Sequence, residues 1–403
     1  MYKKHTHCRA CGSKETLIPV FNLGVQPPAN DFRAPGESHS GFAPLAVEFC
    51  PRCTLAQLSV VVDPVELYRD YAFVTSPSQT MRDHFARLWH DINIDAGREI
   101  KTVLEIGSND GRFLRFMADQ GAKAVGIDPA ENLAADCLEN GVETVTGFFN
   151  TATAEKALEI LGGKPDLIIA RHVMCHIDDW QGFIALIEAA CGPDTLVVIE
   201  APYVVDTLNS TAFDLVYHEH LSYMSVTAMR YLLKDTRLCL ANLHQYRMHG
   251  GSIALVLRRG SMDPYENFER PLTVADWGQF AANSFRAIRD LSHVVRSLRL
   301  MGHTVAGFGA AAKSTVWINA CGFTKDNLDF VTDTTKWKQG KFIPGTNIPV
   351  VDQGALMREV PRYAVLFAWN YREEVLKTQR PYMEAGGQFI IPVPFLNVTP
   401  KGI

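Results

Sequence analysis

Several features are absent from this chain of 403 residues, and each absence excludes a class of protein. No stretch approaches the roughly 20 consecutive apolar residues that a membrane-spanning helix requires. The first eight residues lack the apolar segment of a secretory signal, so we expect a cytoplasmic protein that does not contact membranes. No dense run of Lys and Arg occurs, and the formal net charge is −5, which argues against a nucleic-acid partner.

The composition indicates a globular chain with two or three domains. Hydrophobic residues make up 47% of the sequence and charged residues 21%, which is ordinary for folded domains. In the cytoplasm the nine cysteines are expected to be thiols or metal ligands and not disulfides. No feature demands an oligomer, so we expect a monomer.

Four of the cysteines form two close pairs, Cys8 with Cys11 and Cys50 with Cys53. Two Cys-x-x-Cys pairs can complete a tetrahedral, all-thiolate zinc site, whereas four unconnected thiols are the alternative. Such a site has no open position, so its expected role is to hold a small domain together. The 38 residues between the pairs must form their own loops or strands, and the Pro-rich segment Asn22–Asn30 either covers a substrate or only packs.

The strongest pattern is a strand, a glycine turn and a helix. The apolar run Val103–Ile106 contains an acidic residue, Glu105, and leads through Gly107 to Gly111, after which an amphipathic helix is predicted. This arrangement places backbone N–H groups and a helix N-terminus at the carboxyl end of a parallel strand, where open α/β sheets bind ligands.

The spacing Glu105-x-Gly107-x-x-x-Gly111 differs from the G-x-G-x-x-G of dinucleotide folds and resembles the first motif of class I S-adenosylmethionine (SAM) methyltransferases. Asp128 ends the next predicted strand, 17 positions after Gly111, and an acid there can accept hydrogen bonds from both ribose hydroxyls. Phe149, or its neighbour Phe148, can stack on adenine. The alternative is an ordinary βαβ turn with a helix-capping Asp.

The following strands and helices alternate in the manner of a doubly wound parallel sheet. Apolar runs predict further strands at 144–150, 166–172 and 196–202, with one helix at 130–140 and another ending near Ala190. Segments 239–248 and 251–258 then read as an antiparallel hairpin that closes the sheet, as in the class I methyltransferase fold.

The densest group of reactive side chains follows the fifth of these strands, in Tyr217–Tyr223. Abstraction of a proton beside a carbonyl needs a base of near-neutral pKa, which His supplies, and a donor for the enolate oxygen. His176, beyond the fourth strand, can converge on the same pocket. For any single His a structural, hydrogen-bonded role is the alternative, and His218 with His220 could also be a metal pair, but no third ligand at a characteristic spacing supports that.

With these motifs in place, the whole chain resembles the zinc-containing C-methyltransferases that act on keto-deoxysugars of nucleotide-sugar pathways. Tyr217, Glu219 and His220 are the most specific part of the match. The resemblance implies that His220 is the base and that Tyr217, Glu219 and His176 support catalysis or contact substrate. Cofactor contacts are assigned to Glu105, Gly107, Asn109, Gly111, Asp128, Phe149, Arg171 and His172.

The last third of the chain repeats the strand, glycine turn and helix theme after a long helix, 274–302, and a further strand is predicted at 363–371. Lys313 and Ser314 follow the glycine turn and suit a phosphate, although the Gly-Lys-Ser/Thr of a Walker loop is absent. By the resemblance this degenerate α/β region binds the substrate's nucleotide. Substrate contacts are assigned to Tyr223, Lys313, Ser314, Lys341 and Asn370, with a solvated loop as the alternative for Lys341.

The expected fold is α/β: a zinc-binding domain at 1–75, a Rossmann-like SAM methyltransferase domain at 76–260 and an α/β substrate domain at 261–403. The expected function is SAM-dependent C-methylation of a nucleotide-linked 4-keto-6-deoxy sugar. An O- or N-methyltransferase and a non-catalytic nucleotide-binding zinc adaptor are the alternatives. A dehydrogenase using Gly307 and Gly309 is disfavoured because the third glycine of that fingerprint is missing.

Overall fold

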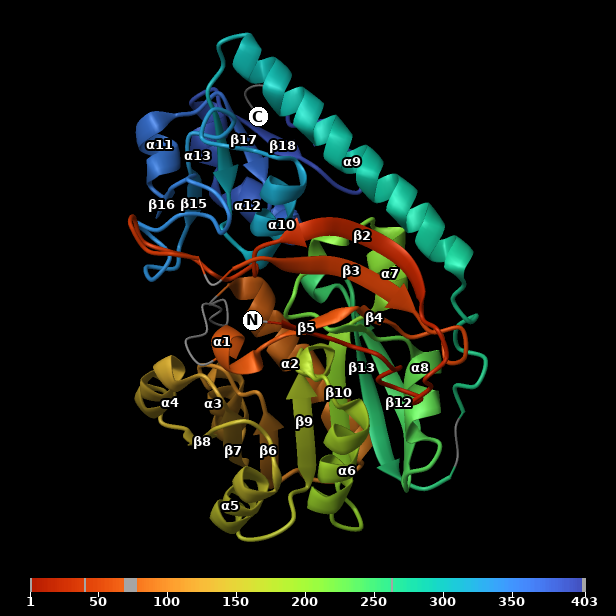
Figure 1. Cartoon of the computed structure of the whole chain (residues 1–403). Helices are drawn as coiled ribbons and strands as arrows, with labels where there is room; N and C mark the ends of the chain where they lie inside the picture. Colours follow the sequence, from red (N-terminus) through yellow and green to blue (C-terminus); the bar gives the residue numbers. More distant parts are fainter. Residues whose placement is uncertain (1, 40, 69–77, 262–263, 401–403) are drawn as a thin grey trace.

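The computed structural model describes residues 2–39, 41–68, 78–261 and 264–400, and arranges them around four sheets (Figure 1). From the sequence alone, the aromatic residues of Tyr68–Ser78 are expected to pack in the core or on the cofactor, and a helix is expected to follow at 79–96; residues 69–77 lie outside the described residues. The helix predicted to follow this segment is confirmed as α2, Gln79–Ala96. Strands β2 and β3 lie between the central sheet and the C-terminal sheet (Figure 1).

The N-terminal region forms two small sheets. Strand β1 (Tyr2–Lys4) pairs with β5 (Val60–Val62), and α1 (Pro64–Tyr68) follows. The second sheet has the order β11-β4-β3-β2, with β2 Ile18–Gln26, β3 Ala43–Phe49, β4 Ala56–Leu58 and β11 Ser222–Tyr223. Strand β11 belongs to residues 217–223 of the central region, here called the reactive segment, so the N-terminal and central regions share a sheet.

The central sheet has seven strands in the order β12-β13-β10-β9-β6-β7-β8. Its parallel strands are β6 Thr102–Ile106, β7 Lys123–Asp128, β8 Glu143–Thr146, β9 Leu167–Arg171 and β10 Leu196–Pro202. The predicted closing hairpin is confirmed as β12 Leu238–Tyr246 and β13 Ser252–Arg259. The strand order reverses beside β6, so its carboxyl end is the switch point at which such sheets bind ligands.

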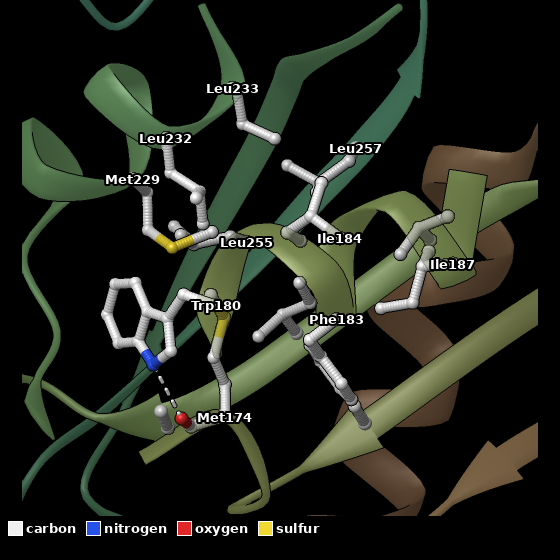
Figure 2. Close-up of a cluster of buried hydrophobic side chains, with 14 of the residues drawn as sticks. Met174, Trp180, Phe183, Ile184, Ile187, Met229, Leu232, Leu233, Leu255 and Leu257 are labelled. Atoms are coloured by element: carbon white, nitrogen blue, oxygen red, sulfur yellow. Dashed lines mark hydrogen bonds between the residues drawn. The ribbon is translucent and has the colours of Figure 1, made fainter. Parts of the chain in front are cut away.

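Alternating side chains of the central strands build a core on each face of the sheet. Val103 and Leu167 face one cluster, formed with α2 and α3 (Arg112–Asp119), whereas Leu104 and Ile168 face the other. On this second face α5 (Thr151–Leu161), α6 (Trp180–Ala190) and α8 (Val226–Leu233) contribute apolar side chains. Figure 2 shows Trp180 of α6 beneath Met229 and Leu232 of α8, with its Nε1 donating to the Met174 carbonyl at 3.0 Å.

The C-terminal region begins with the 27-residue helix α9, Val274–Leu300, whose start is fixed by a capping box between Thr273 and Asp276. Its sheet has the order β16-β15-β14-β17-β18-β19. The strands are β14 Val305–Phe308, β15 Val331–Asp333, β16 Val350–Asp352, β17 Tyr363–Leu366, β18 Gln388–Ile391 and β19 Asn397–Val398. The helices are α10 Ala312–Ala320, α11 Ala355–Glu359, α12 Arg372–Thr378 and α13 Arg380–Glu384. Helix α9 extends past this sheet onto β2 (Figure 1).

Three predicted elements end earlier or begin differently in the structure. The strand expected at 144–150 stops at Thr146, because Gly147 adopts φ +146° and Asn150 caps α5. The strand expected at 363–371 stops at Leu366, and Trp369–Tyr371 form a 3₁₀ turn. The helix expected at 130–140 begins as a 3₁₀ turn and becomes α4 at Ala134–Glu139, and the short α7, Val204–Asn209, was not predicted.

Candidate active site

A cavity of about 510 Å³ lies at the carboxyl edge of the central sheet. Its walls come from all three regions: Val61 from the N-terminal sheet, the loops of the central sheet, and Ala311 and Asn370 from the C-terminal region. The predicted site residues that line it are Gly107, Asn109, Asp128, Phe149, Arg171, His172, His176, Tyr217, His220, Lys313 and Asn370. Residues from distant parts of the sequence therefore line one cavity, at the edge of the sheet where the parallel strands end.

The glycine turn after β6 forms one wall of this cavity. Gly107 and Asn109 have φ of +71° and +53°, and the Asn109 backbone N–H donates to Asp128 Oδ2 at 2.7 Å. The Ala130 N–H donates to Asp128 Oδ1 at 2.8 Å. Burial raises the pKa of Asp128, and these two donors oppose that effect. The carboxylate is thereby fixed at the cavity wall, where it fits the ribose of a bound nucleoside.

A buried ion pair supports the same wall from behind. Arg171 donates from Nε and Nη2 to Glu105 Oε1 at 3.0 and 2.8 Å, and its guanidinium stacks 4.0 Å from the centre of the Phe113 ring. Burial raises the pKa of Glu105 to about 7, although Arg171 opposes the shift. Glu105 Oε2 is buried without a hydrogen-bond partner among the described residues. Glu105 does not line the cavity, so it supports this wall through Arg171; the groups in the wall that suit SAM are the Gly107 turn and the ribose acceptor Asp128.

The reactive segment contributes a hydrogen-bonded pair. His220 Nδ1 lies 2.8 Å from the Leu215 carbonyl, which can only accept, so Nδ1 carries the proton. His220 Nε2 is then the acceptor for the Tyr217 hydroxyl, 2.6 Å away. Burial, with the neighbouring His176, holds the pKa of His220 well below its usual value. The imidazole is therefore neutral at pH 7 and available as a base.

His176 stands beside this pair, with 5.2 Å between the two imidazole centres. Its Nδ1 donates to the main-chain carbonyl of Glu219 at 2.6 Å, which leaves Nε2 as the unprotonated nitrogen. Burial lowers the pKa of His176 to about 4. The Tyr68 hydroxyl, from α1, also reaches the Glu219 carbonyl, at 3.3 Å.

Glu219 itself is buried behind the cavity wall and does not line it. Its Oε1 accepts from Asn30 Nδ2 at 2.9 Å, and Oε2 has no hydrogen-bond partner among the described residues. Burial raises the pKa of Glu219 to about 7, and the Asn30 donor opposes the rise. The carboxyl group can thus change its charge near neutral pH.

A buried histidine that the sequence reasoning missed also lines the cavity. His84, on α2, places Nε2 2.9 Å from Glu200 Oε1, and His172 Nε2 lies 3.7 Å from the same oxygen. Burial alone would raise the pKa of Glu200, but the two histidines hold it well below its usual value. The signal was present, because His84 shares the buried face of its helix with Met81 and Leu88 at helical spacing.

The predicted substrate residues divide into two groups. Lys313 and Asn370 line the cavity, and Lys313 Nζ lies 4.4 Å from the centre of the Trp369 ring. Burial lowers the pKa of Lys313, and the charge of Asp214 opposes the shift.

The remaining assigned residues lie off the cavity. Ser314 donates to the Ala311 carbonyl at 2.6 Å, and Lys341 stacks on Trp337. Tyr223 is buried against Trp277 in the sheet shared with the N-terminal region. Gly111 lies behind the turn, where an added Cβ would meet Val142 at 2.5 Å.

The four paired cysteines form a separate centre. Cys8 Sγ lies 3.3 Å from Cys53 Sγ and Cys11 Sγ lies 3.7 Å from Cys50 Sγ, and all four sulfurs lie within 4.8 Å of one another. A tetrahedral zinc with Zn–S of about 2.3 Å separates its sulfurs by about 3.8 Å, so the set fits zinc. In each knuckle the residue after the second cysteine, Gly12 or Thr54, has a left-handed conformation that turns the chain.

A second group of ligand-type side chains was not predicted. Cys175, His176 and His220 bring ligand atoms within 4.8 Å of one another. Burial raises the pKa of the Cys175 thiol to about 12, and its sulfur donates to the His172 carbonyl at 3.6 Å. The group offers three ligand atoms of mixed type, and both histidines are held by main-chain carbonyls, so it does not resemble the four-cysteine centre.

Comparisons with known proteins agree with this geometry. Three family profiles match in order: a zinc binding domain at 8–68, a methyltransferase domain at 75–238 and a C-methyltransferase C-terminal domain at 247–394. The C-methyltransferase NovU of Streptomyces niveus is 32% identical over 404 residues, covering 96% of this chain and 95% of the relative.

Two further matches cover a smaller part of the chain. The ubiquinone biosynthesis O-methyltransferase of Pseudomonas paraeruginosa is 34% identical over 99 residues, covering 22% of this chain and 43% of that protein. The structure of N-methyltransferase NodS from Bradyrhizobium japonicum with S-adenosyl-L-homocysteine (SAH) aligns with a TM-score of 0.36 and 14% identity. It covers 46% of this chain and 90% of the other.

Together, the cavity and the matched families define a SAM-dependent methyltransferase with a zinc centre. Within that class, the chain belongs to the family of zinc-binding C-methyltransferases, over nearly its whole length. The predicted fold, cofactor and metal are thereby confirmed. None of the helices in the described ranges is long and apolar enough to cross a membrane.

Proposed function

We propose that the enzyme methylates a ring carbon beside the keto group of a nucleotide-linked 4-keto-6-deoxy sugar. The observation that carries the proposal is the position of the Tyr217–His220 pair and His176 in one cavity with the Gly107 turn. A base and a proton donor thus lie beside the place where the methyl donor binds. The name of the relative NovU supports C-methylation as the reaction type.

The protein's own groups would act in the following order. The Tyr217–His220 pair takes the proton from the ring carbon, and the proton ends on His220 Nε2. Once His220 Nε2 is protonated, the Tyr217 hydroxyl is released from it and can donate a hydrogen bond to the enolate oxygen, with the neutral His176 imidazole packed beside the pair. When bound against the Gly107 turn and Asp128, SAM would supply an electrophilic methyl group to the ring carbon, with the S–C electron pair leaving to sulfur to give SAH. The walls hold both reactants in line and limit access of water.

Lys313 is the proposed contact for the anionic part of the substrate. It lines the cavity at the start of α10, and a buried ammonium there with a lowered pKa favours an anionic partner such as a diphosphate. Asn370 and Ala311 extend the same wall, which gives a sugar nucleotide room between the central and C-terminal regions. We retain a monomer as the working unit.

The test is mass spectrometry of the protein incubated with SAM and a panel of nucleotide-linked 4-keto sugars in heavy water. The expected product gains one methyl group, and its methylated carbon holds no deuterium. Without SAM, the same carbon should exchange its proton for deuterium. The His220→Ala variant should lose both reactions while binding SAH like the wild type.

His90→Ala is a matched control, because His90 is exposed on α2. Methyl attachment at oxygen or nitrogen would replace the proposal with the O- or N-methyltransferase alternative. Tight nucleotide binding without turnover on any sugar would favour the adaptor.

A further inference from the structure

One loop of the zinc-binding domain, residues 26–33, here called the bridging loop, lies behind the cavity wall and contacts Glu219. We propose that Asn30 of this loop is a positioning residue for methyl transfer, which holds Glu219 and, through the Glu219 main chain, His176. The proposal rests on the proposed function of His176 and the Tyr217–His220 pair. No role follows for Asn30 from the sequence pattern, because its partner lies 189 positions away.

Hydrogen bonds from the bridging loop stabilise the charged form of the Glu219 side chain. Glu219 is fully buried, and an isolated carboxylate in such a place is strongly disfavoured. Among the described residues no Lys, Arg or His forms an ion pair with it. The donors that oppose its desolvation are the Asn30 side chain, at 2.9 Å, and backbone groups at Ala29, Asn30 and Glu219 itself. Loss of the Asn30 amide would therefore favour the protonated, neutral carboxyl.

The main chain of Glu219 has a second task. Its carbonyl oxygen accepts hydrogen bonds from the His176 Nδ1–H, at 2.6 Å, and from the Tyr68 hydroxyl, at 3.3 Å. This contact fixes which nitrogen of His176 faces the cavity without a proton. Glu219, whose side chain is hydrogen-bonded to Asn30, thus determines the tautomer and the ring orientation of His176 through its main-chain carbonyl.

The bridging loop itself is held from the other side by the C-terminal region. The Thr315 hydroxyl donates to the Ala29 carbonyl at 2.9 Å, and the Phe342 N–H donates to the Arg33 carbonyl at 2.9 Å. The Phe32 ring lies 6.5 Å from Trp337, centre to centre. Asn30 is thereby placed by two regions and acts on the third.

The titratable groups near Glu219 determine which of them changes charge when the pH is varied around 7. The bridging loop faces it with the neutral Asn30, α1 brings Tyr68, and the turn after β9 brings His176, whose pKa is about 4. On its own segment the nearest titratable side chains are His218 and His220, and burial lowers the pKa of both. Near pH 7 Glu219 is therefore the group in this set that changes charge.

The test compares Asn30→Ala, Asn30→Asp and Glu219→Gln with the matched control Asn22→Ala. Asn22 lies in the same domain but is exposed, and its Oδ1 only accepts from the Gly24 N–H. We expect Asn30→Ala to lower kcat about tenfold, with the Kd of SAH within twofold of wild type. The acidic limb of its pH–rate profile should move to higher pH. The double variant Asn30→Ala with Glu219→Gln should be no slower than Glu219→Gln alone.

A second measurement does not depend on the sugar substrate. Carbon NMR of protein labelled with ¹³C-glutamate, compared with Glu219→Gln, reports the ionisation of Glu219 directly. Asn30→Ala should raise its pKa by about one unit, because a hydrogen bond to a charged group is lost. Asn30→Asp should raise it further, because a second carboxyl group then faces the first.

The outcomes separate the two proposals. If no keto sugar is methylated but the Glu219 titration moves as expected, the proposed function fails and the role of Asn30 in holding Glu219 stands. An unchanged titration, or kcat losses of Asn30→Ala and Glu219→Gln that simply multiply in the double variant, would overturn the positioning role. Zinc content and SAH binding of each variant show whether it is folded.

Discussion

The turn after β6 allows a quantitative prediction, because one of its glycines is required for two separable reasons. Gly107 has φ +71°, and a Cβ built on it would lie 2.2 Å from Val173 Cγ2. The left-handed conformation costs an L-residue about 1–2 kcal/mol. The steric conflict adds about 1–3 kcal/mol, as overpacking does elsewhere. We therefore expect Gly107→Ala to destabilise the protein by about 2–5 kcal/mol.

Two further variants separate these contributions. Gly97 ends α2 with φ +63°, but a Cβ there meets nothing within 4 Å, so Gly97→Ala should cost only the conformational part, about 1–2 kcal/mol. In Val173→Ala the offending methyl is gone and the remaining Val173 Cβ lies at 3.6 Å, an ordinary contact. The double variant Gly107→Ala with Val173→Ala should recover about 1–3 kcal/mol relative to additivity.

The assay is denaturant unfolding, with SAH titration calorimetry on the same samples. Since the turn also aims the Asn109 N–H at Asp128, Gly107→Ala should weaken SAH binding and Gly97→Ala should not. The reasoning is refuted if Gly107→Ala costs no more than Gly97→Ala, or if the Val173 change gives no recovery.

The other predictions concern the zinc centre, the proton-transfer pair and pH. Removal of zinc by a chelator, or the Cys53→Ser substitution, should lower the melting temperature and abolish methyl transfer, because the reactive segment continues the N-terminal sheet at β11. Calorimetry combined with metal analysis checks this prediction. Tyr217→Phe should reduce kcat by about 10²-fold with SAH affinity unchanged, measured by single-turnover kinetics. His176 has a pKa of about 4 when folded and about 6.5 when unfolded, so the unfolded chain binds more protons in that window. The contribution of His176 to the free energy of unfolding is therefore complete above pH 6.5 and decreases by about 3 kcal/mol as the pH falls toward 4. In urea unfolding, His176→Asn should lose less stability over this pH range than the wild type. An equal loss would count against a buried neutral imidazole.

The sequence predicts what is local and periodic. Strands β6, β7, β9 and β10 appear where apolar runs indicated them, and their polar ends meet at one edge because parallel strands share that edge. The convergence of His176 with His220 follows from the same geometry. Such features depend on spacing along the chain, which a single sequence displays.

Features that depend on packing between distant segments could not be predicted. Nothing in the pattern shows that Asn30 reaches Glu219, or that Tyr223, assigned to the substrate, instead enters a sheet of another region and lies off the cavity. The end of β8 is a smaller case: the sequence predicts a strand over 144–150, but Gly147 and the helix cap at Asn150 end it at Thr146. There a local turn signal outweighed the apolar pattern.

The pairing of β11 with β4 has a consequence for protein engineering. Ser222 and Tyr223 take their backbone partners from Gln57 and Ala56, and the Arg9 guanidinium donates to the Leu221 carbonyl at 3.2 Å. A chimera that exchanges only residues 1–68 between relatives would therefore place a foreign sheet edge against the native segment 217–223. The unit of exchange is discontinuous: the N-terminal region has to travel with segment 217–223, even though about 150 residues separate them in the sequence.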